Sequence, residues 1–222
     1  MIQLKKTSAI IDQDEVVLLK SAFERDHCVL LPGLLDPELL KFLAPRLDQQ
    51  TWIRKIHPDV GAEDVLNDAL AVGLLDFVTN TPAFLAAVRD ISGRADVAIF
   101  RGRIYRLMPE SEDYDSWHSD VVQDEAPRLA GMSINLGARA YTGGALQFRA
   151  ADSAHVALEV VNTGWGDATL FAISRQLKHR VTAVTGSEPR LAFAGWFSCG
   201  TDDYFASLRR SAGGNCPLDR KR

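Results

Sequence analysis

Apolar residues recur at helical spacing near the start of the chain. Val16, Leu19 and Phe23 are separated by three and four positions, and Val17 and Leu18 widen the same stripe. Spacings of three and four residues place side chains on one face of a helix. The pattern therefore predicts an amphipathic helix whose apolar stripe packs on a core.

A buried strand and three more helices are expected in the first part of the chain. The apolar run 28–31 ends at a Pro-Gly pair and predicts a short buried strand. Asp36 as N-cap and Pro37 as first helical residue then mark the start of a helix. Its buried face is expected to consist of Leu39, Leu40, Phe42 and Leu43. Further helices are expected at 63–77 and 82–91.

From about residue 96, short apolar and β-branched runs alternate with Gly, Asp and Ser clusters. The runs lie at 97–107, 118–122, 129–136, 145–148, 156–161, 168–173, 179–184 and 191–197. This texture is typical of strands in a β-sandwich or barrel. Eight strands that follow helices predict an α+β fold, a double-stranded β-helix (jelly roll, cupin-like) with N-terminal helices packed on the major sheet.

The last predicted strand is apolar on both faces. One face holds Leu191, Phe193 and Phe197, and the other holds Arg190, Ala192, Ala194 and Trp196. A strand of this kind is covered on both sides, as the helical layer requires. We therefore expect one domain over residues 1–222, with mainly helical support at 1–94, a jelly-roll core at 95–198 and a C-terminal tail at 199–222.

Composition narrows the class of protein. The chain has 222 residues, of which 46% are hydrophobic and 24% charged, with a net charge of -4. This balance fits a globular domain and argues against a nucleic-acid partner, because no basic stripe is present. No apolar run approaches a membrane span, the N-terminus lacks a signal peptide, and the three cysteines form no CxxC pair. We expect a cytoplasmic protein.

One pair of residues suggests a metal site. His118 and Asp120 are two positions apart in a predicted strand, so their side chains can reach one ion together. Chance alone gives roughly half a His-x-acid match in a chain of this composition, so the pair needs context. His179 and Arg190 supply it. They are eleven positions apart with a turn between them, and an antiparallel return would place Arg190 beside the strand of His179.

These residue types suit one chemistry. Two histidines and one carboxylate on one face of iron leave three positions open, as in non-haem oxygenases. Two open positions suit a chelating 2-oxo acid and the third suits O2. A guanidinium is the best side chain for the far carboxylate of that acid, because its fork gives two parallel hydrogen bonds.

The order and spacing of several motifs resemble the iron(II)/2-oxoglutarate-dependent dioxygenase superfamily, in its prolyl-4-hydroxylase-like and phytanoyl-CoA-hydroxylase-like branches. The motifs are Tyr105, His118-x-Asp120, Gly143-Gly144-Ala145-Leu146, Gly166-Asp167 with Phe171, His179-Arg180-Val181, and Arg190 with Trp196. Residues 29–39 also resemble the second branch. The resemblance covers most of 15–198.

The resemblance implies a reaction and a set of site residues. His118, Asp120 and His179 would bind Fe(II), and Arg190 would bind the C5 carboxylate of 2-oxoglutarate. Tyr105 would either bind that carboxylate as well or be a buried aromatic with a satisfied hydroxyl. Thr169 and Asn135 are weaker candidates for the same pocket. The implied activity is hydroxylation of a small organic substrate, with 2-oxoglutarate and O2 converted to succinate and CO2 and ascorbate as a stimulant.

Alternatives remain open at this point. The chain could be a non-catalytic jelly-roll protein that binds a metal or small acid, or a cupin-type enzyme that uses zinc or manganese without 2-oxoglutarate. Residues 108–116 could form a solvated loop or a lid. Candidates for the pocket lining are Arg103, Trp117, Arg149, Arg175 and Trp196, although pairing with surface acids explains the arginines equally well.

The remaining histidines are assigned plainer roles. His57 lies near the active-site mouth or in solvent, His155 lies on the surface, and His27 ends the first helix. We expect a small-molecule substrate as the partner, and we expect neither a nucleic acid nor a membrane to bind.

Overall fold

The computed structural model describes residues 1–48, 51–58, 60–109, 111, 115–121, 127–161 and 163–199. Helices in this part of the chain are α1 (Gln13–Asp26), α2 (Pro37–Asp48), α3 (Ala69–Thr79) and α4 (Pro82–Ser92). None of these helices alone is long and apolar enough to cross a membrane. Helices α3 and α4 together pass the same test by length and composition, but the pair is bent by 63°.

A seven-stranded sheet forms the centre of the molecule. Its order is β3-β11-β7-β14-β6-β5-β4, and all neighbours are antiparallel. The strands are β3 (Cys28–Leu31), β4 (Trp52–His57), β5 (Gly61–Leu66), β6 (Ile99–Leu107), β7 (Arg128–Asn135), β11 (Ala168–Ala172) and β14 (Arg190–Ser198).

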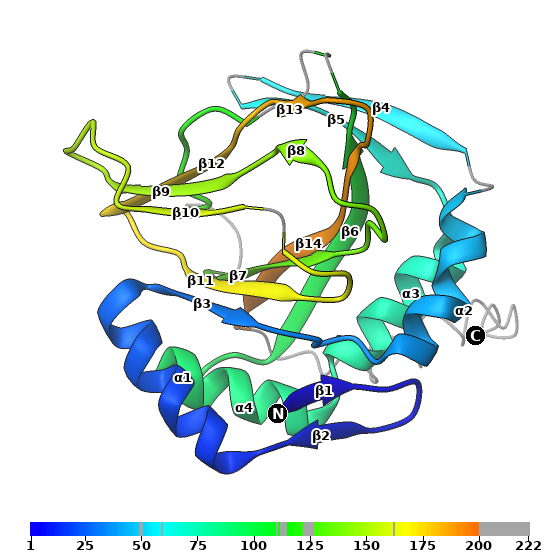
Figure 1. The fold of residues 1–222 in the computed structure, drawn as a ribbon. Coiled ribbons are helices and arrows are strands. Elements are labelled where there is room, and N and C mark those ends of the chain that lie inside the picture. The colour runs from blue at the N-terminus through cyan, green and yellow to red at the C-terminus, as the bar shows by residue number, and fades with distance from the viewer. Residues whose placement is uncertain are drawn as a thin grey trace, which may run out of the picture.

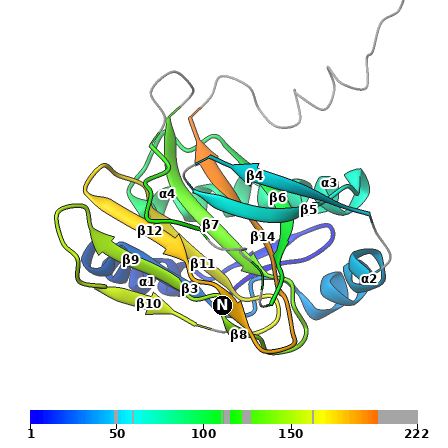
Figure 2. The same ribbon diagram turned by 90° about the horizontal axis from the view of Figure 1, so that it is seen from above.

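A smaller sheet faces the larger one. It has the order β10-β9-β12, with β9 (Leu146–Ala150), β10 (Leu158–Val160) and β12 (Leu177–Val181). The short pair β8 (Thr142–Gly143) and β13 (Val184–Thr185) extends this layer. Figure 1 shows the smaller sheet above the larger one, with α1, α4 and the hairpin of β1 (Ile2–Leu4) and β2 (Ala9–Ile11) on the opposite side. In the view of Figure 2 the smaller sheet lies over β3, β11 and α1. The predicted fold class is confirmed.

The helices pack on the large sheet through an apolar core. Phe84 of α4 contacts Phe197, whose ring also lies 4.7 Å from that of Phe100, and Phe193 packs against Phe100 at 5.6 Å. All four phenylalanines are fully buried. A second core cluster, which includes Leu146, Phe148 and Phe171, fills the space between the two sheets. The predicted division of the faces of the last strand is confirmed for its phenylalanines.

Most predicted elements form, and their caps explain where they begin. Asp36 accepts a hydrogen bond from the backbone of Glu38 at 2.9 Å, as expected for the residue that starts α2. His27 ends α1 in a left-handed conformation, and its N–H donates to Phe23. Cys28 is buried in β3, and burial raises the pKa of its thiol to about 12.

Three apolar residues of the predicted helix faces are not buried. Val17 and Leu18 are 63% and 72% exposed on the outer face of α1, and Phe42 of α2 is 43% exposed. The ammonium of Lys6 lies 4.4 Å from the Phe42 ring. An apolar stripe wider than the contact that covers it necessarily leaves some members in solvent, so the predicted faces were too wide.

The predicted helix at 63–77 is wrong in its first part. Gly61–Leu66 is strand β5, which pairs with β4 and β6, and helix α3 begins only at Ala69. Asp68 is the N-cap, because its carboxylate accepts from Leu70 and Ala71 at 2.9 and 3.2 Å. The region before residue 95 therefore contains strands besides its helices. The predicted domain boundaries stay a prediction, and the predicted tail beyond residue 199 lies outside the described residues.

Candidate functional site

A cavity of about 360 Å3 opens between the two sheets. Its walls come from β6, β7 and β14 of the large sheet, from β9 and β12 of the small sheet, and from the segment around His118. The described residues 118–121 of the predicted strand at 118–122 form no continuous strand. In its place His118 makes a single antiparallel bridge to His179, with backbone N···O distances of 3.1 and 2.9 Å.

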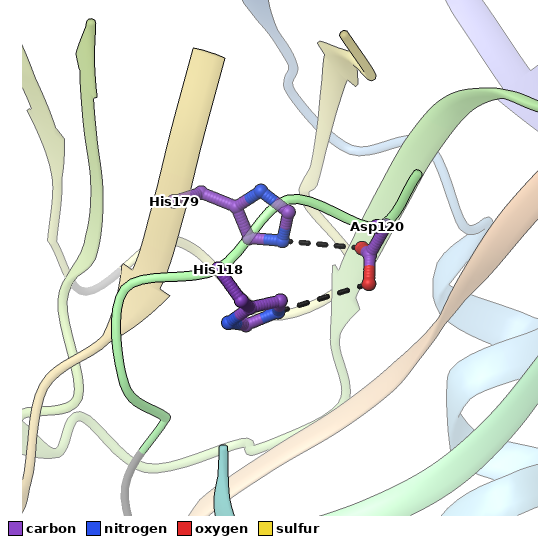
Figure 3. A group of neighbouring side chains, drawn as sticks. All are labelled: His118, Asp120 and His179. Atoms are coloured by element: carbon purple, nitrogen blue, oxygen red, sulfur yellow. Dashed lines mark ion pairs between the residues drawn. The ribbon is translucent and has the colours of Figure 1, made fainter. Parts of the chain in front are cut away.

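This bridge brings three candidate metal ligands together. The His118 and His179 rings lie 4.5 Å apart, and Asp120 reaches both of them (Figure 3). An Asp120 carboxylate oxygen lies 3.1 Å from His179 Nε2, and the other lies 3.7 Å from His118 Nε2. The candidate ligand atoms all lie within 4.8 Å of one another. The predicted metal site requires this convergence. It arises from the bridge at His118 and the loop that carries Asp120, and not from the continuous strand that was expected.

Neighbouring groups fix the orientation of the three side chains. His118 Nδ1 lies 2.6 Å from the carbonyl of Ser116, so Nδ1–H donates there and leaves the lone pair of Nε2 for a metal. Trp196 Nε1 donates to Asp120 at 2.6 Å. Burial would raise the pKa of Asp120, but hydrogen bonds from His179 and Trp196 and the charge of His118 lower it to about 2. Asp120 is therefore an anionic ligand at neutral pH, and the donor set fits ferrous iron.

Two aromatic rings pack against the ring of His179. Phe171 and Phe148 lie 5.0 and 6.1 Å from the His179 ring. The Phe171 ring covers Gly131 of β7 so closely that a Cβ at residue 131 would come within 2.2 Å of it. Position 131 must therefore stay without a side chain for Phe171 to lie against His179.

Arg190 lies in the same cavity but not where its predicted strand pairing would place it. Its strand β14 pairs with β6 and β7, whereas His179 lies on β12 of the other sheet. The predicted pairing was wrong, and Arg190 instead belongs to the facing sheet. Both residues line the cavity because the two sheets face each other.

The guanidinium of Arg190 is buried and held by hydroxyl groups. It donates to the Tyr105 hydroxyl and to Ser133 Oγ, the latter at 3.0 Å. Gly144 allows the neighbouring turn to approach closely. It has a φ of 59°, and a Cβ there would lie 2.9 Å from Cδ of Arg190. Glycine at position 144 is therefore required beside Arg190.

The weaker candidates lie beside a small cavity on the other side of Arg190. Thr169 and Asn135 both line this space. The Asn135 amide donates to the carbonyls of Thr163 and Gly164 at 2.6 and 3.1 Å, and its oxygen accepts from Gly137 at 3.0 Å. These contacts give Asn135 a structural task in the loop around it.

The candidates for the pocket lining separate into two groups. Arg103 and Trp196 line the cavity. The ring of Trp117 lies between the guanidinium groups of Arg149 and Arg180, at 4.4 and 4.6 Å, on the face of β9 and β12 opposite Phe148 and His179. Arg175 is exposed. Trp117, Arg149 and Arg175 are therefore not among the lining residues, and that expectation is wrong for these three.

Among the remaining histidines, His57 lines the cavity, as one of its two expected roles required, and His155 is exposed. His57 Nε2 lies 3.0 Å from Glu63. The proposed lid at 108–116 falls partly on residues 110 and 112–114, which lie outside the described residues.

Sequence reasoning missed three polar residues of the cavity: Asp115, Arg128 and Ser133. Ser133 and Arg128 lie on β7, five positions apart, in a run whose other residues are mainly apolar. Nothing in the sequence distinguishes a hydroxyl or guanidinium that faces a cavity from one that faces solvent. Their role follows only from the position of the opposite sheet.

Comparisons with known proteins agree with this geometry. Residues 103–198 match the family described as the 2OG-Fe(II) oxygenase superfamily. A search of curated protein sequences finds no match.

Solved structures share the fold at low sequence identity. A Pseudomonas putida prolyl-4-hydroxylase superposes with a TM-score of 0.63 at 16% identity, covering 83% of this chain and 99% of that one. The epimerase SnoN in complex with Fe3+, alpha ketoglutarate and nogalamycin RO gives 0.62 at 18% identity, with 86% of each chain covered. A Trichoplax adhaerens prolyl hydroxylase in complex with a hypoxia inducible factor peptide gives 0.62 at 11% identity, covering 91% of this chain and 94% of that one.

The family match includes all five predicted site residues, and the fold of most of the chain agrees with it. Residues 103–198 therefore match the 2OG-Fe(II) oxygenase superfamily, and the chain shares the fold of the solved oxygenases on which it superposes.

Proposed function

We propose that this protein is an iron- and 2-oxoglutarate-dependent oxygenase that hydroxylates a small organic substrate, with His118, Asp120 and His179 as the iron ligands and Arg190 as the anchor for 2-oxoglutarate. The observation that carries the proposal is the convergence of the three ligand atoms within 4.8 Å in the wall of a cavity that Arg190 also lines. In the overall reaction one C–H bond of the substrate becomes C–OH, while 2-oxoglutarate and O2 become succinate, CO2 and the inserted oxygen atom.

The three ligands are prepared for a divalent metal. His118 presents Nε2 because its Nδ1 is bound to a carbonyl, and Asp120 stays ionised because Trp196 and the histidines stabilise its charge. Bound iron supplies the activation of O2, which no side chain can provide. The residues around it supply orientation, and the rings of Phe148 and Phe171 pack against His179.

Arg190 is prepared for a carboxylate. Tyr105 and Ser133 hold its guanidinium before any ligand arrives, so little side-chain freedom is lost on binding. The Tyr105 hydroxyl accepts from Arg190, and its own proton remains available for a carboxylate oxygen. We propose that Arg190 and Tyr105 share the C5 carboxylate of 2-oxoglutarate.

The size of the cavity supports a small substrate. About 360 Å3 lies near the lower limit of ordinary ligand pockets, and the co-substrate takes part of it. The related structures bind a peptide in one case and nogalamycin RO in another, so kinship alone does not indicate the substrate. We also propose a cytoplasmic location, which the free thiols of Cys28 and Cys199 support.

The experiment that tests these roles combines spectroscopy with turnover. Under anaerobic conditions, Fe(II) and 2-oxoglutarate added to the protein are expected to give a visible charge-transfer band, and exposure to O2 is expected to give succinate. His179→Ala should lose both signals, whereas the exposed control Arg175→Ala should keep both.

Three outcomes would contradict the proposal. An undiminished band in His179→Ala would remove this residue from the ligand set. Failure of the wild-type protein to release succinate would favour the non-catalytic alternative. Activity with zinc or manganese that needs no 2-oxoglutarate would favour the cupin-type alternative.

A further inference from the structure

Most charged groups of the cavity already have a partner or a role. Arg103 donates two parallel hydrogen bonds to Glu63, at 2.6 and 2.9 Å, and His57 binds the same carboxylate at 3.0 Å. Arg190 is held by hydroxyl groups and is assigned to the co-substrate. Asp120 is assigned to the metal. Among the described residues, two charged groups of the cavity, Asp115 and Arg128, therefore remain for the recognition of a substrate.

One of these groups is the carboxylate of Asp115. The backbone of Asp115 is fixed, because its N–H donates to Val181 of β12 at 2.9 Å and the residue is bridged to Gly61. Its half-buried side chain lines the cavity and makes no hydrogen bond or ion pair with any residue that the structure describes. A carboxylate that lacks a hydrogen-bonding partner in such a place is costly: burial raises its pKa, and the charges of His118, Arg190 and Arg103 oppose that rise only in part.

The other group is the guanidinium of Arg128. It stacks on the Trp196 ring at 3.8 Å, which fixes its plane. Its polar contact within the described part of the chain is a long one, 3.5 Å to Asp120 Oδ1, an oxygen of a carboxylate assigned to the metal. Arg128 therefore presents donors beside the metal site that the protein does not fully use.

The charges around the cavity balance before a substrate binds. The described cavity residues, with Glu63, contribute three guanidinium groups and three carboxylates: Arg103, Arg128, Arg190, Glu63, Asp115 and Asp120. The divalent metal and the dianionic co-substrate cancel each other. A substrate with a net charge would leave one unpaired charge in a partly buried site, which is strongly unfavourable.

We propose that the substrate is a small zwitterion, an amino acid whose ammonium group binds Asp115 and whose carboxylate binds Arg128. The proposal rests on the proposed function, since it assumes that Asp120 and Arg190 are engaged by the metal and by 2-oxoglutarate. The two charges of an amino acid satisfy both remaining groups and keep the cavity neutral. The place of Arg128 beside Asp120 would hold the carboxylate end of the substrate close to the metal.

The test is a binding measurement that does not depend on turnover. The full chain is loaded with Mn(II) and N-oxalylglycine, an inert analogue of 2-oxoglutarate, and titrated by calorimetry with each of the twenty proteinogenic amino acids. The amino acid that binds most tightly is then compared with its deamino acid and with its decarboxylated amine. Each truncated compound should bind about 10- to 100-fold more weakly, as expected for loss of a charge-assisted hydrogen bond.

Variants assign each end of the ligand to one residue. In Asp115→Asn the deamino acid should bind as well as the amino acid does, whereas the penalty for the decarboxylated amine should persist. Arg128→Gln should show the reverse. If each variant abolishes the affinity difference for only one of the truncated compounds, the substituted residue contacts the missing group directly. A purely structural role for either residue would weaken binding of the amino acid, the deamino acid and the decarboxylated amine alike. Asp64→Asn is the matched control, because Asp64 pairs with Arg106 and does not line the cavity.

Failure of this proposal is distinguishable from failure of the proposed function. Loaded protein that binds no amino acid, or binds the truncated compounds equally well, would overturn the zwitterion proposal and leave the oxygenase assignment in place. Protein that does not bind N-oxalylglycine in the presence of Mn(II) would overturn the proposed roles of the site residues, and the zwitterion proposal with them.

Discussion

The nine residues of β14 form two faces with different functions: one packs in the hydrophobic core and the other lines the cavity. On the face toward α4, Phe193 and Phe197 pack against Phe100 without a polar atom. On the opposite face, Arg190 and Trp196 donate hydrogen bonds into the cavity. The difference indicates that the stability of the fold is concentrated on the helical side, so that the cavity side is free to hold unpaired charges.

The largest effect that separates the two faces is expected from Phe193→Ala. Phe193 is fully buried, so its truncation should lower the free energy of unfolding by about 3–5 kcal/mol. Denaturant unfolding measures this loss, and Phe193→Leu should lose much less. The protein that remains folded should bind 2-oxoglutarate with wild-type affinity. A large loss of affinity at unchanged stability would show that the two faces are not independent.

The reverse outcome is expected from Arg190→Ala. Removal of a buried group that makes charge-assisted bonds to a ligand should weaken 2-oxoglutarate binding by about 2–5 kcal/mol. Binding of Fe(II) or Mn(II) alone should change little, because Arg190 contacts none of the three candidate metal ligands in the described part of the chain. Titration of the anaerobic charge-transfer band with 2-oxoglutarate measures the effect. Equal affinities in variant and wild type would place the carboxylate anchor elsewhere.

The sequence predicted the two faces of β14 better than it predicted their surroundings. Alternation of side chains is a local property, so Phe193 and Arg190 could be assigned to opposite faces from spacing alone. Strand pairing is not local. Arg190 was expected beside the strand of His179, but β14 pairs with β6 and β7, and the two residues meet because the sheets face each other.

The same limit explains the error at residues 63–66. Glu63 is 3% exposed because Arg103 of the neighbouring strand binds it with two hydrogen bonds. This partner lies 40 positions away in the sequence, and no local pattern indicates that it is there. Asp115 and Arg128 were not predicted for a similar reason. A cavity forms between two surfaces, and the local sequence around one residue does not indicate which surface will face it.

A smaller effect is expected from pH on the helical side. Burial raises the pKa of Asp76 of α3 to about 6, with partial compensation from the Gly102 N–H and from Arg101. The folded state therefore holds this proton more tightly than the unfolded chain does. The contribution to stability is fully present below pH 4 and is lost as the pH rises toward 6, by about 1–3 kcal/mol because the group is partly solvated.

Asp76→Asn should remove this dependence. The variant should be more stable than the wild type at pH 7 by about 1–3 kcal/mol and equally stable at pH 4. Denaturant unfolding at several pH values measures the difference, with the exposed Asp90→Asn as control. Because Asp76 does not line the cavity, 2-oxoglutarate affinity should not follow the change. Parallel changes in stability and affinity would mean that the helical side controls the site.

An effect of similar size is expected where the cavity face of β14 contacts a metal ligand. Trp196→Phe keeps an aromatic ring for Arg128 to stack on and removes the hydrogen bond to Asp120. Loss of one such bond to a charged group should weaken metal binding by about 1–3 kcal/mol. It should also raise the pKa of Asp120, because one of the contacts that lower it is gone. The metal affinities of the variant and the wild type, measured at pH 7, should differ by about 1–3 kcal/mol. Equal metal affinities would mean that Trp196 acts only by packing, and that the two faces of β14 are more alike than their contacts indicate.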